Sequence, residues 1–193
     1  MDGKSAIRWI RKNAKKLGVD PDRIVAAGGS AGGHVAACTG TIQGFEQPGE
    51  DEKVSSRPNA MALFNPALLL AKTEAYPAID DEKLASLRPR MGVEPAELSP
   101  FHQLKKGLPP TIIFHGKGDT TVPYQTAELF AAKAKENSDE VVLAGYEGQP
   151  HGFFNFGRAK NEHYLSTMKS LEAFLVDRGL LEGPARESIT IIE

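Results

Sequence analysis

The chain has 193 residues, of which 40% are hydrophobic and 25% charged, and its formal net charge is −2. This length and composition are typical of one globular domain with a sizeable buried core. The balanced charge argues against nucleic acid or an anionic membrane as the main partner, and no stretch approaches the roughly 18 apolar residues of a membrane span. A single cysteine, Cys38, excludes an internal disulfide and a cysteine-based zinc cluster. No signal-peptide core follows Met1, which makes the cytoplasm the default expectation.

The predicted elements alternate between helices and strands along the chain. An amphipathic helix comes first, with Ile7, Ile10, Ala14 and Leu17 at helical spacing. Short apolar runs then predict four buried strands, at residues 23–27, 60–64, 111–115 and 140–144. Helices follow the first, third and fourth of them, at about residues 31–38, 123–136 and 164–179. This order predicts an α/β fold in one domain over residues 1–193, with a mostly parallel sheet covered by helices on both faces.

Two further segments stand apart from that alternation. Residues 71–100 lack periodicity and hold four prolines, which predicts an excursion with short helices outside the sheet. Residues 188–192 are a β-branched run, which favours an extra strand.

A glycine-rich turn, residues 28–33, joins the first strand to the next helix, and three chemistries use such a turn. A dinucleotide-binding turn needs glycine at its first, third and sixth positions, and neither register starting at Gly28 or Gly29 provides it. A P-loop needs lysine and then serine or threonine after its last glycine, whereas His34 and Val35 follow here. The remaining pattern is G-x-S-x-G, matched by Gly28, Gly29, Ser30, Ala31 and Gly32. A serine at such a turn is strained and projects above the sheet edge, as a nucleophile must.

A serine nucleophile needs a base to take its proton and an acid to orient that base. In a strand–elbow–helix architecture these partners follow in the order serine, acid, histidine. Asp119 lies just beyond the third predicted strand, and His151 follows the fourth, so both belong to the same edge of a parallel sheet. The other histidines compete for the base role, but we expect His34 to pack locally and His115 to face the core or support the Asp119 loop. His102 and His163 lie in polar contexts with no partner in view. Glu147 is a weaker alternative for the acid.

These blocks resemble the α/β-hydrolase superfamily, and within it the hormone-sensitive-lipase-like and acetyl-esterase-like carboxylesterases. The resemblance covers about residues 4–180 and is carried by residues 28–34, 115–123 and 150–153, with weaker likeness at 5–9 and 20–24. It implies that Ser30 is the nucleophile, His151 the general base and acid, and Asp119 the carboxylate that orients the histidine. It also implies that the backbone N–H of Ala31 donates to the oxyanion, and that no metal or organic cofactor is needed.

The same resemblance identifies what this sequence lacks. The family takes its other oxyanion donors from a His-Gly-Gly-Gly-type loop, and it has about four strands before the opening helix. Neither is present here, so we expect an α/β-hydrolase fold truncated at its N-terminus. The strand at 23–27 would then have an open edge, and we expect a second copy of the chain or residues 188–192 to cover it.

The predicted function is hydrolysis of short-chain acyl esters through an acyl-enzyme, with a small-molecule ester as partner. The excursion at 71–100 would correspond to the cap of related enzymes. One alternative is a serine peptidase of prolyl-oligopeptidase type, although no propeller domain is present. The other is a non-catalytic hydrolase fragment or binding module that keeps the elbow but lacks the oxyanion loop.

Overall fold

The computed structural model describes residues 1–79 and 81–184, so the run predicted as a strand at 188–192 lies outside the described residues. The chain alternates helices and strands after two opening helices. The elements are α1 (Asp2–Lys12), α2 (Ala14–Leu17), β1 (Val25–Gly29), α3 (Ala31–Thr41), β2 (Ala60–Phe64), α4 (Asp81–Met91), α5 (Pro100–Gln103), β3 (Thr111–Gly116), α6 (Tyr124–Glu136), β4 (Val141–Tyr146), a 3₁₀ turn (Ala159–Asn161) and α7 (Glu162–Asp177).

The four strands form one parallel sheet in the order β1-β2-β3-β4. Each strand therefore pairs with its neighbours in sequence, and all four carboxyl ends reach the same edge. The register places Gly29 beside Phe64, Phe64 beside Phe114, and Gly116 beside Tyr146. The predicted parallel sheet is confirmed.

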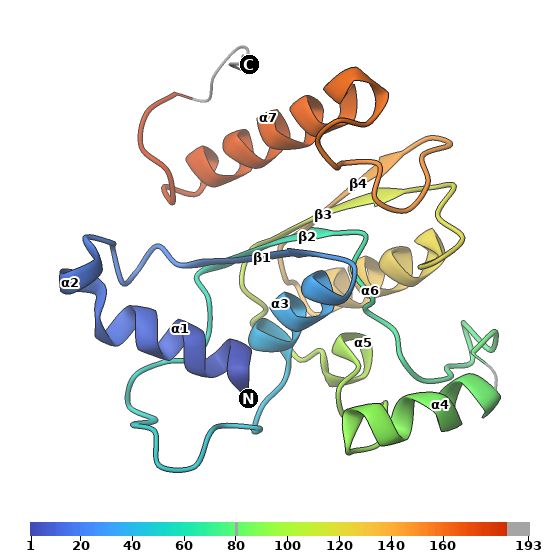
Figure 1. Ribbon diagram of the computed structural model, residues 1–193, viewed down its shortest axis with the longest axis horizontal. Coiled ribbons are helices and arrows are strands. Elements are labelled where there is room, and N and C mark those ends of the chain that lie inside the picture. The colour runs from blue at the N-terminus through green and yellow to red at the C-terminus, as the bar shows by residue number, and fades with distance from the viewer. Residues whose placement is uncertain (80, 185–193) are drawn as a thin grey trace.

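Helices cover both faces of the sheet (Figure 1), as the sequence predicts. On one face α3 and α6 pack against it, and their contacts include Ala37, Met61 and Phe130 in one apolar cluster. On the opposite face α7 packs alone and brings Phe174 against Phe114 in a second cluster. β2 and β3 lie between these two clusters and are buried along their whole length, which explains their uninterrupted apolar sequences.

Three element boundaries differ from the prediction. β1 starts at Val25 rather than at residue 23, because the N–H of Ile24 bonds the Asn59 side chain, and it continues through Gly29 by pairing with β2. β4 extends to Tyr146, which pairs with Gly116. The first helix is interrupted at Asn13, which separates α1 from α2.

The segment between β2 and β3 stays outside the sheet, as predicted, and contains α4 and α5. Both helices lie on the side of α3 and α6 that faces away from the sheet in Figure 1, and α5 packs against both of them. The segment is fastened to the body of the domain where Nζ of Lys133, on α6, donates to the carbonyl of Phe101 at 2.7 Å. Within residues 1–79 and 81–184, no helix combines the length and apolar character needed to cross a bilayer.

Candidate active site

The turn between β1 and α3 holds Ser30 in an unusual backbone conformation, with φ 54° and ψ −118°. Its N–H donates to the carbonyl of Phe64 at 2.9 Å, which fixes the turn to the end of β2. A Cβ at position 28 would lie 2.4 Å from the carbonyl carbon and oxygen of Gly32, so only glycine fits there. At Gly29 a Cβ would meet the ring of Phe154 at 2.9 Å, whereas the space around Gly32 is open. The local chain thus forms the tight elbow that the G-x-S-x-G pattern predicts.

The carboxylate of Asp119 lies in the loop after β3, and its side chain is buried. Oδ1 accepts the N–H groups of Thr121 at 2.8 Å and Val122 at 2.9 Å. Oδ2 accepts from the side-chain amide of Asn65 and from Nδ1 of His151. Burial alone would raise the pKa of Asp119, but the bonds from Val122, His151, Asn65 and Thr121 outweigh it and hold the pKa below its usual value. The group is therefore a fixed anion.

The imidazole of His151 lies between that anion and the serine. Its Nδ1 is 2.6 Å from Oδ2 of Asp119, and its Nε2 is 2.9 Å from Oγ of Ser30. An ionised carboxylate can only accept, so Nδ1 carries the proton and Nε2 presents its lone pair to the serine hydroxyl. The hydroxyl then donates to Nε2, which is the arrangement needed for proton removal from Oγ.

The structure brings Ser30, Asp119 and His151 into one continuous hydrogen-bonded chain. They come from the loops after β1, β3 and β4, which meet at the same sheet edge. Ala31 is the first residue of α3, and its N–H has no intrahelical acceptor, as at every helix start. Ala31 thus lies next to Ser30 with a backbone donor that could serve an oxyanion.

The competing candidates have other partners. Nε2 of His34 lies 2.8 Å from the carbonyl of Leu98 and 3.3 Å from Sγ of Cys38. The sequence predicts local packing for this histidine, and the bond to Leu98 also joins it to the segment between β2 and β3. His115 is fully buried, and its Nε2 lies 2.8 Å from the Val122 carbonyl, so it supports the Asp119 loop as predicted. Glu147 forms an exposed ion pair with Lys117.

One residue of the site is missing from the sequence-based prediction. Asn65, directly after β2, donates its side-chain amide to Asp119 and is itself fully buried. The signal available in the sequence is a polar residue at the carboxyl end of a wholly apolar strand, the same position rule that identifies Asp119 and His151.

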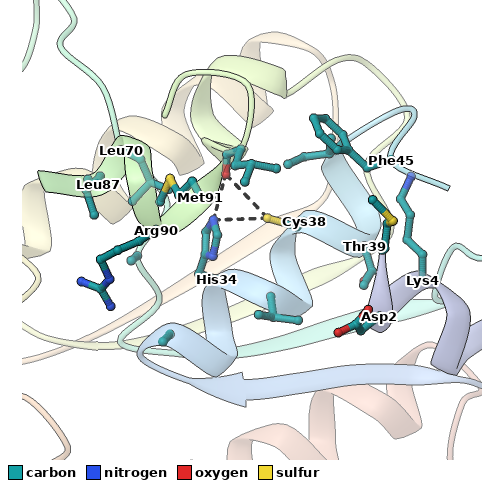
Figure 2. Close-up of a pocket in the computed structure, with 17 residues that line it drawn as sticks. Asp2, Lys4, His34, Cys38, Thr39, Phe45, Leu70, Leu87, Arg90 and Met91 are labelled. Atoms are coloured by element: carbon teal, nitrogen blue, oxygen red, sulfur yellow. Dashed lines mark hydrogen bonds between the residues drawn. The ribbon is translucent and has the colours of Figure 1, made fainter. Parts of the chain in front are cut away.

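A cavity of about 670 Å³ runs from the elbow along the exposed side of α3 (Figure 2). Ala31, the first residue of α3, contributes to its wall. Leu87, Arg90 and Met91 of α4 line the cavity on the other side (Figure 2). Its further lining comes mainly from the apolar or small side chains Val35, Cys38, Ile42, Phe45, Ala67, Leu70 and Leu98. Such a volume and lining are typical of a site for a small, largely apolar organic molecule. Among residues 1–79 and 81–184, no three His, Cys, Asp or Glu side chains gather closely enough to hold a metal ion.

The parallel sheet, the elbow at Ser30 and the loops that follow β3 and β4 define an α/β-hydrolase fold. The model of the BD-FAE family matches residues 1–134, and the chain belongs to that family.

Similar proteins carry esterase names. Over 186 aligned residues the chain is 30% identical to the probable carboxylic ester hydrolase LipM of Mycobacterium tuberculosis. This alignment covers 92% of this chain and 42% of LipM. It is 31% identical to a probable isoprenylcysteine alpha-carbonyl methylesterase of Arabidopsis thaliana, over 78% of this chain and 34% of that protein. The esterase Est2 of Thermogutta terrifontis superposes with a TM-score of 0.86 at 49% identity, over 93% of this chain and 64% of that one. The chain thus spans less than half the length of these two curated relatives.

Proposed function

We propose that the protein is a serine carboxylic-ester hydrolase that acts on short-chain acyl esters through an acyl-enzyme. The observation that carries this proposal is the hydrogen-bonded chain from Ser30 through His151 to Asp119. The proposal is supported by the esterase names of similar proteins and by solved structures of Est2 with propionate or butyrate bound and phosphonylated by sarin.

In the proposed mechanism, Nε2 of His151 takes the proton of Ser30 as Oγ attacks the ester carbonyl. The carbonyl oxygen becomes an oxyanion that accepts the N–H of Ala31. When the tetrahedral intermediate collapses, the imidazolium gives its proton to the departing alcohol, leaving Ser30 acylated. A water molecule, deprotonated by the same Nε2, then attacks the acyl group and releases the carboxylic acid. Asp119 stays ionised throughout and stabilises the imidazolium.

Among the elbow glycines, we assign Gly28 and Gly29 to the exposure of the nucleophile, because a Cβ at either would clash, whereas Gly32 completes the motif in open space. We assign the cavity beside Ala31 to the substrate. A small, mostly apolar cavity suits an uncharged acyl or alcohol group better than a peptide, which argues against the prolyl-oligopeptidase alternative. The non-catalytic alternative predicts a different assay result: a protein that has the elbow but does not hydrolyse esters.

The test is hydrolysis of p-nitrophenyl acetate and butyrate by the purified chain and by Ser30→Ala. We expect turnover by the parent chain and loss of at least about a thousandfold in the variant. Ser166→Ala is a matched control, because the Ser166 hydroxyl bonds Tyr146 and the His163 carbonyl and, within the described residues, none of Ser30, Asp119 and His151. Turnover that survives in Ser30→Ala would refute the nucleophile assignment, and a folded, inert parent would favour the non-catalytic alternative.

We further propose that residues 1–193 form one domain with a cap-like excursion at 71–100, and that a second copy pairs along β1. β1 is the first strand in the sheet order, so its outer edge presents backbone groups that another strand can pair with. A single cooperative unfolding transition is expected for one domain. Light scattering that gives only a monomer would refute the pairing of two copies.

A further inference from the structure

We propose that Asn65 is a positioning residue for the proposed hydrolytic site: its side-chain amide fixes the Asp119 carboxylate so that Oδ2 receives His151. This inference rests on the proposed function. It adds to the site a residue from the carboxyl end of β2, so that all four strands contribute. Ser30, Asp119 and His151 follow β1, β3 and β4, and Asn65 follows β2, the strand between the nucleophile and the acid.

The contacts at Asp119 show what the amide does. The N–H groups of Thr121 and Val122 both bond Oδ1. Without a donor at Oδ2, the carboxylate could still turn about the held Oδ1 and move Oδ2 away from His151. Asn65 and His151 both donate to Oδ2. His151 is partly exposed and lies in a loop, whereas Asn65 is fully buried, so Asn65 is the more firmly held of the two donors. Asn65 therefore holds Oδ2 in place independently of the loop that carries His151.

The backbone around Asn65 links this alignment to the nucleophile. The N–H of Asn65 donates to the Phe114 carbonyl at 2.8 Å, which ties it to β3. The preceding carbonyl, that of Phe64, accepts the N–H of Ser30 at 2.9 Å. Two adjacent residues at the end of β2 therefore hold the turn of the serine and the carboxylate of the acid at a fixed separation.

Asn65 lowers the stability of the fold through one of its own side-chain atoms, and packing alone does not explain why an asparagine stands here. Oδ1 of Asn65 is buried and has no hydrogen-bond partner within the described part of the chain. A buried acceptor without a partner destabilises a fold. The positive φ of 43° favours asparagine or glycine, but glycine would satisfy it without burying an amide. The donated hydrogen bond to Asp119 is what distinguishes asparagine from glycine here.

The other charged or titratable groups that face Asp119 are the two histidines. His151 donates at 2.6 Å, and His115 of β3 lies 3.5 Å from Oδ2. Burial lowers the pKa of His115, although the Val122 carbonyl and Asp119 oppose this, so its imidazole is neutral and brings no cation to Oδ2. Asn65 is thus the donor, besides His151, that holds this oxygen.

Two variants separate the amide from the backbone conformation. Asn65→Gly keeps the positive φ and removes the donor, and we expect kcat to fall about 10- to 100-fold. We also expect the pH profile of kcat/KM to change, because the Asn65 amide is one of the hydrogen-bond donors that hold the pKa of Asp119 below its usual value. Asn65→Asp keeps the shape but places a second carboxylate at Oδ2. The two carboxylates then share a proton, so its activity relative to the parent should fall as pH rises.

Asn59→Gly is the matched control. Asn59 precedes the same strand, and its Oδ1 accepts the N–H of Ile24 at 3.0 Å, at the sheet edge away from the site. We expect it to lower the melting temperature and leave the pH profile unchanged. The positioning role is refuted if Asn65→Gly shows the same behaviour as Asn59→Gly.

A spectroscopic readout keeps the test independent of turnover. The proton between His151 Nδ1 and Asp119 should give a far-downfield ¹H resonance that disappears in His151→Gln. In Asn65→Gly we expect this resonance to broaden through exchange with water, and an unchanged position and width would overturn the inference. An inert parent chain with this resonance altered by Asn65→Gly would contradict the proposed function and still support the positioning role.

Discussion

Gly116→Ala should misplace His151 without touching it. Gly116 ends β3 beside the loop that carries His151, and an added Cβ would lie 2.1 Å from the carbonyl oxygen of Gln149. Ordinary contact begins at 3.4 Å, so the loop must retreat by 3.4 − 2.1 = 1.3 Å. That carbonyl also accepts the N–H of Gly118 at 3.0 Å, so the shift strains the Asp119 loop as well. A displacement of about 1 Å at a reacting group costs roughly a hundredfold in rate, or about 2.7 kcal/mol.

The assay is kcat on p-nitrophenyl butyrate together with the melting temperature of each variant. Ile113→Val in the same strand is the destabilised control, because Ile113 is fully buried and far from the loop end, and its truncation costs about 0.5–1.5 kcal/mol of stability. We expect Ile113→Val to melt earlier with normal kcat, and Gly116→Ala to lose kcat. Wild-type kcat in Gly116→Ala would show that the position of the His151 loop does not limit the rate.

Three further outcomes are expected. Gly28→Ala should abolish activity, because the added Cβ would meet backbone atoms. Gly32→Ala should keep activity and gain up to about 1 kcal/mol in stability, because the space there is open and alanine favours a helix. Burial lowers the pKa of His115, so the unfolded state takes up a proton at higher pH than the folded state does. The free energy of unfolding, measured by urea titration, should therefore fall as the pH drops below about 6.5. His115→Gln should flatten this pH dependence. Burial raises the pKa of the Cys38 thiol to about 12, so native protein at pH 8 should resist iodoacetamide and react only when unfolded; rapid native alkylation would contradict this.

The sequence is most informative where a structural feature depends on residues that are close together in the chain. The elbow depends on close backbone approach within a few residues, so the small residues around Ser30 could be interpreted directly. The fully buried strands β2 and β3 appear as continuous apolar runs, because both of their faces are covered by helices. The order of serine, acid and histidine follows from the rule that loops after parallel strands share one edge.

The features that were not predicted depend on contacts between distant residues. Asn65 donates to Asp119, 54 residues away in the chain, and His34 contacts Leu98, 64 residues away. No periodicity encodes such a pair, since it exists only once the strands have paired in register. The boundary of β1 was misplaced for the same reason: Gly29 has low intrinsic strand preference and extends the strand only because Phe64 lies beside it.

The backbone of Ser30 has a consequence for how this protein can change over generations. A φ of 54° with ψ of −118° is unfavourable for any residue with a Cβ and costs on the order of 1–3 kcal/mol. Glycine at this position would relieve that strain, so selection for thermal stability alone would favour replacement of Ser30, the residue that we propose as the nucleophile. A serine in this conformation therefore represents a trade-off between stability and the proposed activity. Engineering for heat resistance should take its gains elsewhere, beginning with open positions such as Gly32.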